Sequence, residues 1–156
     1  MRFAQDTGVS PERSRAEIET LLKRYNATTF GYATDTGQAM VQFRLKDRIV
    51  RFIIPMPKLE EVRKTPTGRD RNRSKIPQVL AQEERQRWRA LLLVIKAKLE
   101  AVESGITTFE QEFLAHIVLP DGKTVGSHIL PAVAAAYASG KMPKGLLPAW
   151  GGSDAT

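Results

Sequence analysis

The chain has 156 residues, 42% of them hydrophobic, and a formal net charge of +7. This length suits one domain with a hydrophobic core, and the composition argues against wholesale disorder. The sequence contains no cysteine, which excludes disulfides, a thiol nucleophile and Cys-ligated metal sites. Because His116 and His128 are the only histidines, we also expect no metal centre and no cofactor.

The sequence shows no targeting or membrane segment. The first nine residues contain Asp6 and no apolar run, so they do not resemble a secretory signal. The longest stretch of low charge, 124–140, is too weakly apolar to span a bilayer. We therefore expect a soluble cytoplasmic protein with no membrane partner, and the lack of cysteine suits a reducing compartment.

The N-terminal third predicts a helix followed by a small sheet. Ser10 can cap a helix that begins at Pro11, and apolar residues continue at helical spacing to Tyr25. Three extended segments follow, at 28–33, 38–45 and 48–54. Their short connections predict an antiparallel meander, which Pro55 and Pro57 end because neither can donate to a ladder.

Residues 58–77 show neither a helical nor an alternating pattern, and their prolines, glycine and charges predict a basic flexible linker. Further helices are expected at 78–103, from Thr108 to about Ile117, and at 127–139, with a tight turn at 120–123. The predicted fold is therefore α+β. Its parts are a helix plus β-meander (1–57), the linker (58–77), a helical part with one long helix that forms one unit with the meander (78–140), and a loose tail (141–156).

The positive charge is concentrated in the linker. Residues 58–75 carry seven basic and three acidic side chains, a net charge of +4. The basic residues nearest one another are Arg63, Lys64, Arg69, Arg71, Arg73 and Lys75. Such a segment can neutralise several phosphates at once, and arginine adds bidentate geometry. The alternative is an ordinary solvated loop between two parts of the fold.

Two other groups of side chains suggest binding to single strands. On the sheet, Arg44, Arg48 and Arg51 could lie beside Tyr32, so that cations follow a backbone while bases stack on the ring. We favour the alternative register, which places Phe30 and Tyr32 in the core.

On the long helix, Arg85 and Arg89 share one face beside Trp88, an arrangement that could clamp and stack a nucleotide. We favour core packing for Trp88, because it falls in the apolar stripe of the helix.

The sequence offers little evidence for an enzyme. Phosphate-binding and dinucleotide-binding glycine motifs are missing, as are the zinc-protease and nucleophile-elbow motifs. His116, His128 and Asp121 could form a base and its orienting group, but His116 lies among apolar residues and suits a packed side chain better. We predict no catalytic or metal-binding residues and no enzyme; a small hydrolase or nuclease is the weakest alternative.

Three stretches carry a resemblance to known proteins: RWRALLLVIKAKLEAV (87–102), TTFEQEF (107–113) and LPDGKTVG (119–126). They resemble small proteins encoded by bacteriophages and prophages, and the likeness extends over most of residues 10–145. The resemblance implies a phage protein acting in a bacterial host cell, and it transfers no functional residue.

We therefore expect a phage-type protein that binds nucleic acid through the phosphate backbone without reading sequence. Single strands are preferred over duplex because no helix-turn-helix or basic-zipper pattern is present. The alternative is a protein-interaction module that occupies the nucleic-acid channel of a host enzyme, as an inhibitor or anti-defence factor would. The apolar long helix could also pair with its copy in a homo-oligomer.

Overall fold

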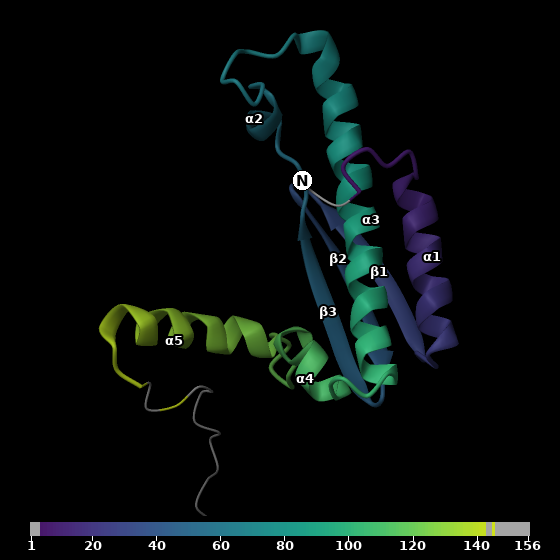
Figure 1. Ribbon diagram of the computed structural model, residues 1–156, viewed down its shortest axis with the longest axis vertical. Helices are drawn as coiled ribbons and strands as arrows, with labels where there is room; N and C mark the ends of the chain where they lie inside the picture. Colours follow the sequence, from purple (N-terminus) through teal and green to yellow (C-terminus); the bar gives the residue numbers. More distant parts are fainter. Residues whose placement is uncertain (1–3, 143–144, 146–156) are drawn as a thin grey trace, which may run out of the picture.

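In the computed structural model, two helices pack on one face of a three-stranded antiparallel sheet, and two further helices follow toward the C-terminus (Figure 1). The structure describes residues 4–142 and residue 145. Its elements are α1 (Pro11–Arg24), β1 (Thr29–Asp35), β2 (Gln38–Leu45), β3 (Arg48–Pro55), α2 (Leu59–Val62), α3 (Ile76–Glu103), α4 (Phe109–Phe113) and α5 (Val125–Ser139). Two 3-10 turns complete it, Arg73–Lys75 and Leu114–His116. The predicted α+β fold is confirmed.

Helix α1 begins where its capping signal predicts. The Ser10 hydroxyl accepts a hydrogen bond from the backbone N–H of Arg13 at 3.2 Å. After the helix, Asn26 adopts the left-handed conformation, with a φ of 66°, that terminates many helices. Ile18 and Leu22 are fully buried between the sheet and α3. Burial of this apolar face stabilises the helix against the sheet.

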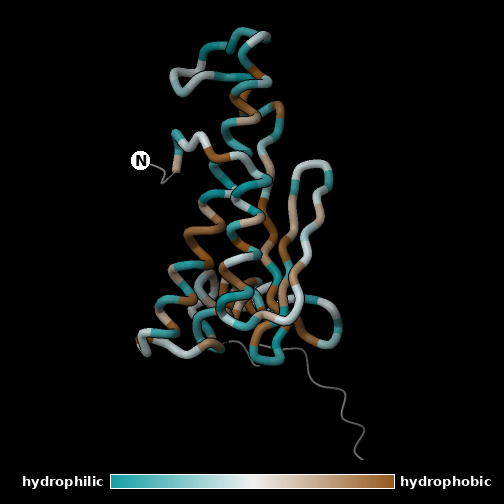
Figure 2. The backbone as a smooth tube through the Cα atoms, turned by 90° about the vertical axis from the view of Figure 1, so that its right-hand side faces the viewer, coloured by the Kyte–Doolittle hydropathy of each residue, from teal (hydrophilic) through white to brown (hydrophobic). Residues whose placement is uncertain are grey.

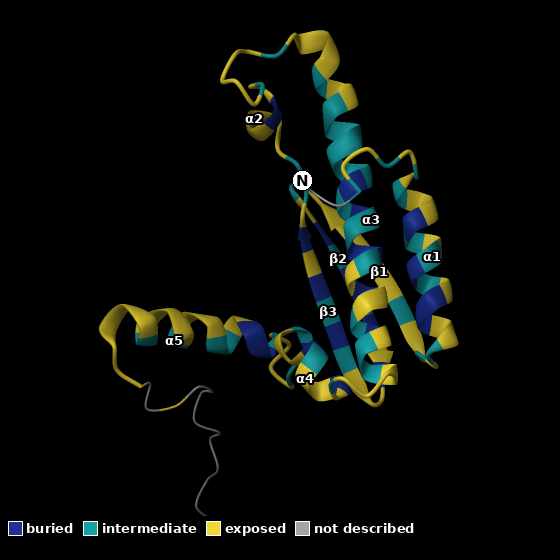
Figure 3. Cartoon of the chain, in the orientation of Figure 1, coloured by how far each residue is buried: buried dark blue, intermediate teal, exposed yellow. Residues whose placement is uncertain are grey.

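The sheet has strand order β1-β2-β3, as expected for a meander. Alternate residues of β2 and β3 face the helices and are buried (Figure 3); they are Ala39, Val41, Phe43, Leu45, Val50, Phe52 and Ile54. The turn between these strands consists of Lys46 and Asp47, both with positive φ, as a two-residue type I′ hairpin turn requires. A type I′ turn matches the right-handed twist of the strands, so β2 and β3 pair continuously from the turn onward.

The aromatic residues of β1 lie on the helix-covered face. Phe30 is opposite Phe43 and Tyr32 is opposite Val41, so both rings share the face of the core. Because β1 is an edge strand, Tyr32 stays 52% exposed. The register that would have put these rings beside the basic residues of the outer face is therefore wrong. The alternative that we favoured is confirmed for Phe30, which packs against the core, whereas Tyr32 lies on the same face but outside the core.

Helix α3 is the longest element and carries the centre of the core. Trp88, Leu91, Leu92, Ile95 and Leu99 are buried on its inner side. The hydrophobic parts of α3 and of the strands lie at the same level of the molecule. The end beyond the strands, which contains the segment before α3, is mostly hydrophilic (Figure 2). The helix starts at Ile76, two residues earlier than predicted, with Pro77 in its first turn.

Residues 58–77, for which we expected no regular element, contain the one-turn helix α2 and a 3-10 turn. Between these elements the chain reverses, with an isolated bridge that joins Lys64 to Asp70. The backbone N–H of Thr65 donates to the carbonyl of Arg69 at 2.8 Å. Buried Val62 anchors the segment. A single apolar side chain is too short a pattern to reveal a helix in the sequence.

The C-terminal elements are short and lead into α5. The predicted capping box is present, because the Thr108 hydroxyl accepts from the Gln111 backbone and the Gln111 side chain accepts from the Thr108 backbone. Helix α5 begins at Val125, two residues before the prediction, and projects away from the sheet (Figure 1). None of the helices within the described residues is long and apolar enough to cross a membrane. The predicted tail, 141–156, lies outside the described residues apart from 141, 142 and 145.

Candidate nucleic-acid interface

Residues 58–75, the basic segment, form one end of the molecule. The segment follows the C-terminal end of β3 and leads into the N-terminal end of α3, and it lies beyond the ends of the strands (Figure 1). Arg87 of α3 ties its base to the body: the guanidinium donates to the Pro55 carbonyl and forms an ion pair with Glu61 at 3.4 Å. The position of the segment is thus set by the core elements on either side of it.

Arg71 is the internal support of the basic segment. Its Nε donates to the Val62 carbonyl at 3.0 Å, and a terminal nitrogen donates to the Lys64 carbonyl at 3.5 Å. Its backbone N–H also donates to the Arg63 carbonyl at 2.7 Å. These bonds satisfy carbonyls at the end of α2, where a positive charge is favourable. Arg71 therefore serves the fold, although the sequence placed it among the binding residues.

The other predicted cations of the segment are exposed, and none forms an ion pair with a described carboxylate; they are Arg63, Lys64, Arg69, Arg73 and Lys75. Elsewhere many basic side chains of the helices are paired: Arg13–Glu17, Arg15–Glu12, Lys23–Glu19, Arg89–Glu17 and Lys98–Glu112. Of the three acids in the segment, Glu61 is neutralised by Arg87. The segment therefore presents a local excess of uncompensated positive charge.

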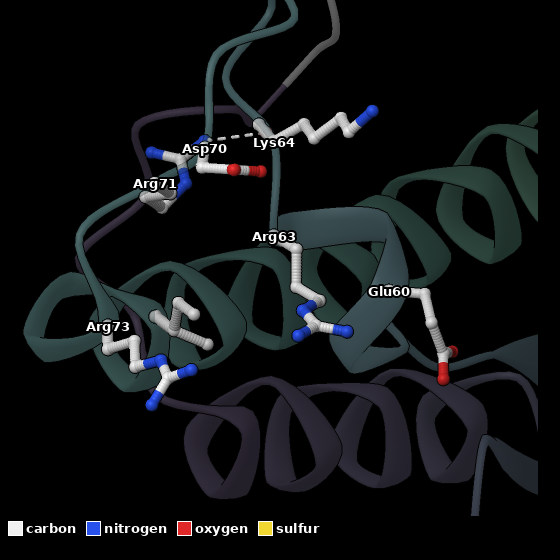
Figure 4. Close-up of a pocket in the computed structure, with 7 residues that line it drawn as sticks. Glu60, Arg63, Lys64, Asp70, Arg71 and Arg73 are labelled. Carbon is white, nitrogen blue, oxygen red and sulfur yellow. Dashed lines mark hydrogen bonds between the residues drawn. The ribbon is translucent and has the colours of Figure 1, made fainter.

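A cavity of about 430 Å³ opens within the basic segment. Its lining residues are Glu60, Arg63, Lys64, Asp70, Arg71, Arg73 and Ile76. In Figure 4 the guanidinium groups of Arg63 and Arg73 point to the same side, whereas the ammonium of Lys64 points away. Two guanidiniums on one side can each take a phosphate in bidentate fashion. The carboxylates of Glu60 and Asp70 limit the net charge of the cavity.

The basic residues of the sheet do not join this segment. The turn between β2 and β3 lies at the opposite end of the sheet (Figure 1), with Arg44 and Arg48 exposed beside it. Arg44 lies on the outer face, but Arg48 follows the alternation of the core face. Arg51 donates to Gln42 at 2.9 Å and to the Gly122 carbonyl at 2.8 Å. Arg44 and Arg51 therefore share the outer face as expected, and the predicted single surface is wrong for Arg48.

The cluster around Trp88 is also closed to a nucleotide. Trp88 is fully buried, which confirms core packing and leaves no ring face for a base. The guanidinium of Arg15 lies 4.7 Å from the ring centre of Tyr32 and 5.0 Å from that of Trp88. Arg89 pairs with Glu17 at 2.6 Å, and Arg85 donates to Gln82. These side chains join α1, α3 and β1; the spacing of Arg85, Trp88 and Arg89 could not reveal that Arg15 reaches them.

The two histidines have different surroundings. The ring of His116 stacks on Phe52 with centres 4.0 Å apart, and burial, together with nearby Lys98, lowers the pKa of His116 below its ordinary 6.5. His128 Nε2 lies 2.6 Å from a carboxylate oxygen of Asp121 and ties the turn to α5. A backbone N–H of Lys123, and then His128, lowers the pKa of Asp121. Within the described residues, no three metal-ligating side chains form a cluster.

Comparison with protein families, curated proteins and solved structures finds no match to this chain.

Proposed function

We propose that the protein binds nucleic acid through the phosphate backbone, with the basic segment as the contact surface. One observation carries this proposal: five exposed cations without an ion-pair partner among the described residues occupy 13 consecutive positions, 63–75. Their approach to a polyanion would release condensed counterions, which is the main source of non-specific affinity. Contacts of this kind position a backbone and do not read bases.

We expect single strands to be preferred over duplex. A flexible strand can bring successive phosphates to Arg63 and Arg73 on a curved surface. The helix of the segment, α2, is a single turn of four residues and offers no side chains for reading a major groove. With Trp88 buried, Tyr32 is the one predicted stacking residue that keeps an exposed ring, so backbone contacts have to supply the affinity. The resemblance to phage and prophage proteins supports a bacterial host as the setting.

A salt titration tests this proposal. Binding of a labelled 20-nucleotide strand and of the matching duplex is measured by fluorescence anisotropy between about 50 and 300 mM salt. We expect the triple variant R63Q/R69Q/R73Q to lower the slope of log K against log salt by about 2. Arg71 is left intact so that the segment keeps its internal support.

A matched variant makes the test specific. R44Q/K46Q/R48Q removes the same charge from the turn at the opposite end of the sheet, where these side chains are also exposed. We expect this variant to bind nearly as the unmodified protein does. No binding at the lowest salt, or equal losses in the two triple variants, would overturn the proposal.

A protein-interaction role is a second proposal, favoured by one observation on α5. This helix of 15 residues contains no Asp, Glu, Lys or Arg, and Leu130, Val133 and Tyr137 are exposed along it. Such a surface suits a protein partner better than a phosphate backbone. An inhibitor of a host nucleic-acid enzyme would combine this helix with the basic segment.

This second role predicts that the intact chain captures and inhibits a bacterial nucleic-acid enzyme. Capture should be lost when Leu130 and Tyr137 are both replaced by Glu. Capture that is unchanged in this variant, or capture without inhibition, would count against it.

A further inference from the structure

Helix α3 carries a second apolar stripe that faces away from the core. It consists of Ala90, Leu93, Val94 and Ala97 at helical spacing, and Ala101 continues it by one more turn. Val94 is 43% exposed. A surface hollow of about 570 Å³ lies along the stripe and is bordered by Lys96 and Glu100. In Figure 3 this outer side of α3 faces the viewer, and no described element lies over it. A helix packed on a sheet usually turns a polar face outward. The exposed apolar stripe therefore indicates a surface for a binding partner.

Two opposite charges border the stripe without forming an ion pair. Lys96 and Glu100 are exposed and one helical turn apart, yet neither forms a salt bridge within the described part of the chain. Other charged side chains of α3 are paired with neighbouring elements, as in Arg87–Glu61, Arg89–Glu17 and Lys98–Glu112. The carboxylate of Glu100 accepts one hydrogen bond, from the exposed Ser104 hydroxyl at 3.4 Å, and its charge is not neutralised by a described cation. The cation and the anion at the edge of the apolar stripe can therefore pair with a partner of complementary charge.

We propose that the partner is a second copy of this chain, with the two α3 helices antiparallel and their two-fold axis beside Ala97. This arrangement sets Val94 against Ala101 of the second copy and Lys96 against its Glu100, and the two-fold axis repeats each contact. Lys96 and Glu100 lie on the same flank of the stripe, and in a parallel two-fold pair that flank would face the opposite flank of the partner. Only the antiparallel orientation brings Lys96 of one copy to Glu100 of the other. The small side chains Ala90 and Ala97 allow the helices to approach closely.

The proposed dimer separates the two basic segments. Ala97 lies 21 residues from the first residue of α3, Ile76, a distance of about 30 Å at 1.5 Å per residue. The two segments would therefore stand about 60 Å apart, at opposite ends of the pair. This inference does not rest on nucleic-acid binding, because the stripe and its charges lie outside the basic segment.

Charge-reversed variants of the full chain test the proposal by sedimentation equilibrium, over about 5 to 500 µM protein for an interface of this small size. In K96E each of the two contacts becomes Glu against Glu, and in E100K each becomes Lys against Lys. We expect either change to raise the dimer Kd on the order of tenfold. A mixture of K96E with E100K restores both attractive contacts, so we expect a heterodimer with an affinity close to that of the unmodified protein.

Further variants separate this interface from general effects of charge and folding. K23E, on α1 and away from the stripe, changes the net charge by the same amount as K96E and is expected to leave dimerisation unchanged. V94D places a charge in the centre of the stripe and is expected to abolish it. Circular dichroism checks that each variant is folded, and the exposed positions 96 and 100 keep the test valid if V94D unfolds. A monomer at all concentrations, or a mixture of K96E and E100K that associates no better than either alone, would overturn the proposal.

Discussion

The guanidinium of Arg71 donates to the backbone carbonyl of Val62 across 3.0 Å and joins the end of α2 to the chain that returns toward α3. Val62 is buried, so this bond forms at the point where the basic segment touches the body. Arg71 thus stabilises the fold of the basic segment through its bonds to the backbone. Its more exposed neighbours carry the charge that is open to a ligand.

The first prediction compares two arginines of equal charge. Arg71→Gln removes one charge and also leaves the Val62 carbonyl without its partner, whereas Arg69→Gln removes the charge alone. We expect the Arg71 change to cost the segment about 1–3 kcal/mol of local stability, because it leaves a carbonyl at the end of α2 unsatisfied. Hydrogen exchange at the amides of residues 62–71 measures this. Equal exchange rates in both variants would show that Arg71 does not support the segment.

The second prediction concerns Trp88. Its side chain is fully buried, and its indole N–H has no hydrogen-bond partner within the described structure. Trp88→Phe keeps most of the ring volume and removes the unsatisfied N–H, so we expect it to cost no more than about 1.5 kcal/mol in the free energy of unfolding. Trp88→Ala should cost about 3–5 kcal/mol. Urea denaturation followed by circular dichroism gives both values; similar losses would argue against this packing.

The third prediction concerns the first turn of α5. A Cβ on Gly126 would lie 2.7 Å from the backbone carbonyl oxygen of Ala115, so this position has no room for a side chain. We expect Gly126→Ala to cost about 1–3 kcal/mol and to loosen the contact between α5 and the turn Leu114–His116. Gly31→Ala is the control, because nothing lies within 4 Å of its added Cβ. Thermal unfolding and amide exchange of 125–130 are the measurements; equal effects of the two changes would contradict this fit.

The fourth prediction is a pH dependence that follows from His116. Burial against Phe52 and nearby Lys98 lowers the pKa of His116 below 6.5 in the folded chain. The unfolded chain therefore takes up a proton first as the pH falls. We expect a stability contribution that is present above pH 6.5 and is lost as the pH falls through the folded pKa of His116. The measurement is the urea concentration at half unfolding as the pH is lowered from about 7.5 to 5. It should fall for the unmodified chain and fall less for His116→Gln.

Much of the fold followed from local patterns. Ser10 and Pro11, the alternation in β2 and β3, and the capping box of Thr108 and Gln111 each act within a few residues, so the sequence was sufficient to predict them. The long helix was also predicted, because its apolar stripe repeats over several turns. The segment 58–77 was different: its order depends on bonds such as that from Arg71 to Val62, which no periodicity reveals.

The candidate site shows the same division. The concentration of positive charge in residues 58–75 was evident from the sequence alone, since counting needs no coordinates. Whether Arg44, Arg48, Arg51, Arg85 and Arg89 are also open to a ligand depended on their neighbours in space, which only the structure shows. Arg89 meets Glu17 of α1, Arg85 meets Gln82 of its own helix, and Arg51 meets Gln42.

The sequence by itself determined the longer helices of this protein, the meander of its strands and the place of its charge, because propensity, periodicity and net charge are local quantities. Only the tertiary structure decided that Trp88 is closed to ligands, that Arg71 supports the backbone, and that Val94 with Lys96 and Glu100 lies uncovered on α3. Each of these depends on which side chains from distant segments meet. Such contacts are set by packing, and packing is decided by the whole chain at once.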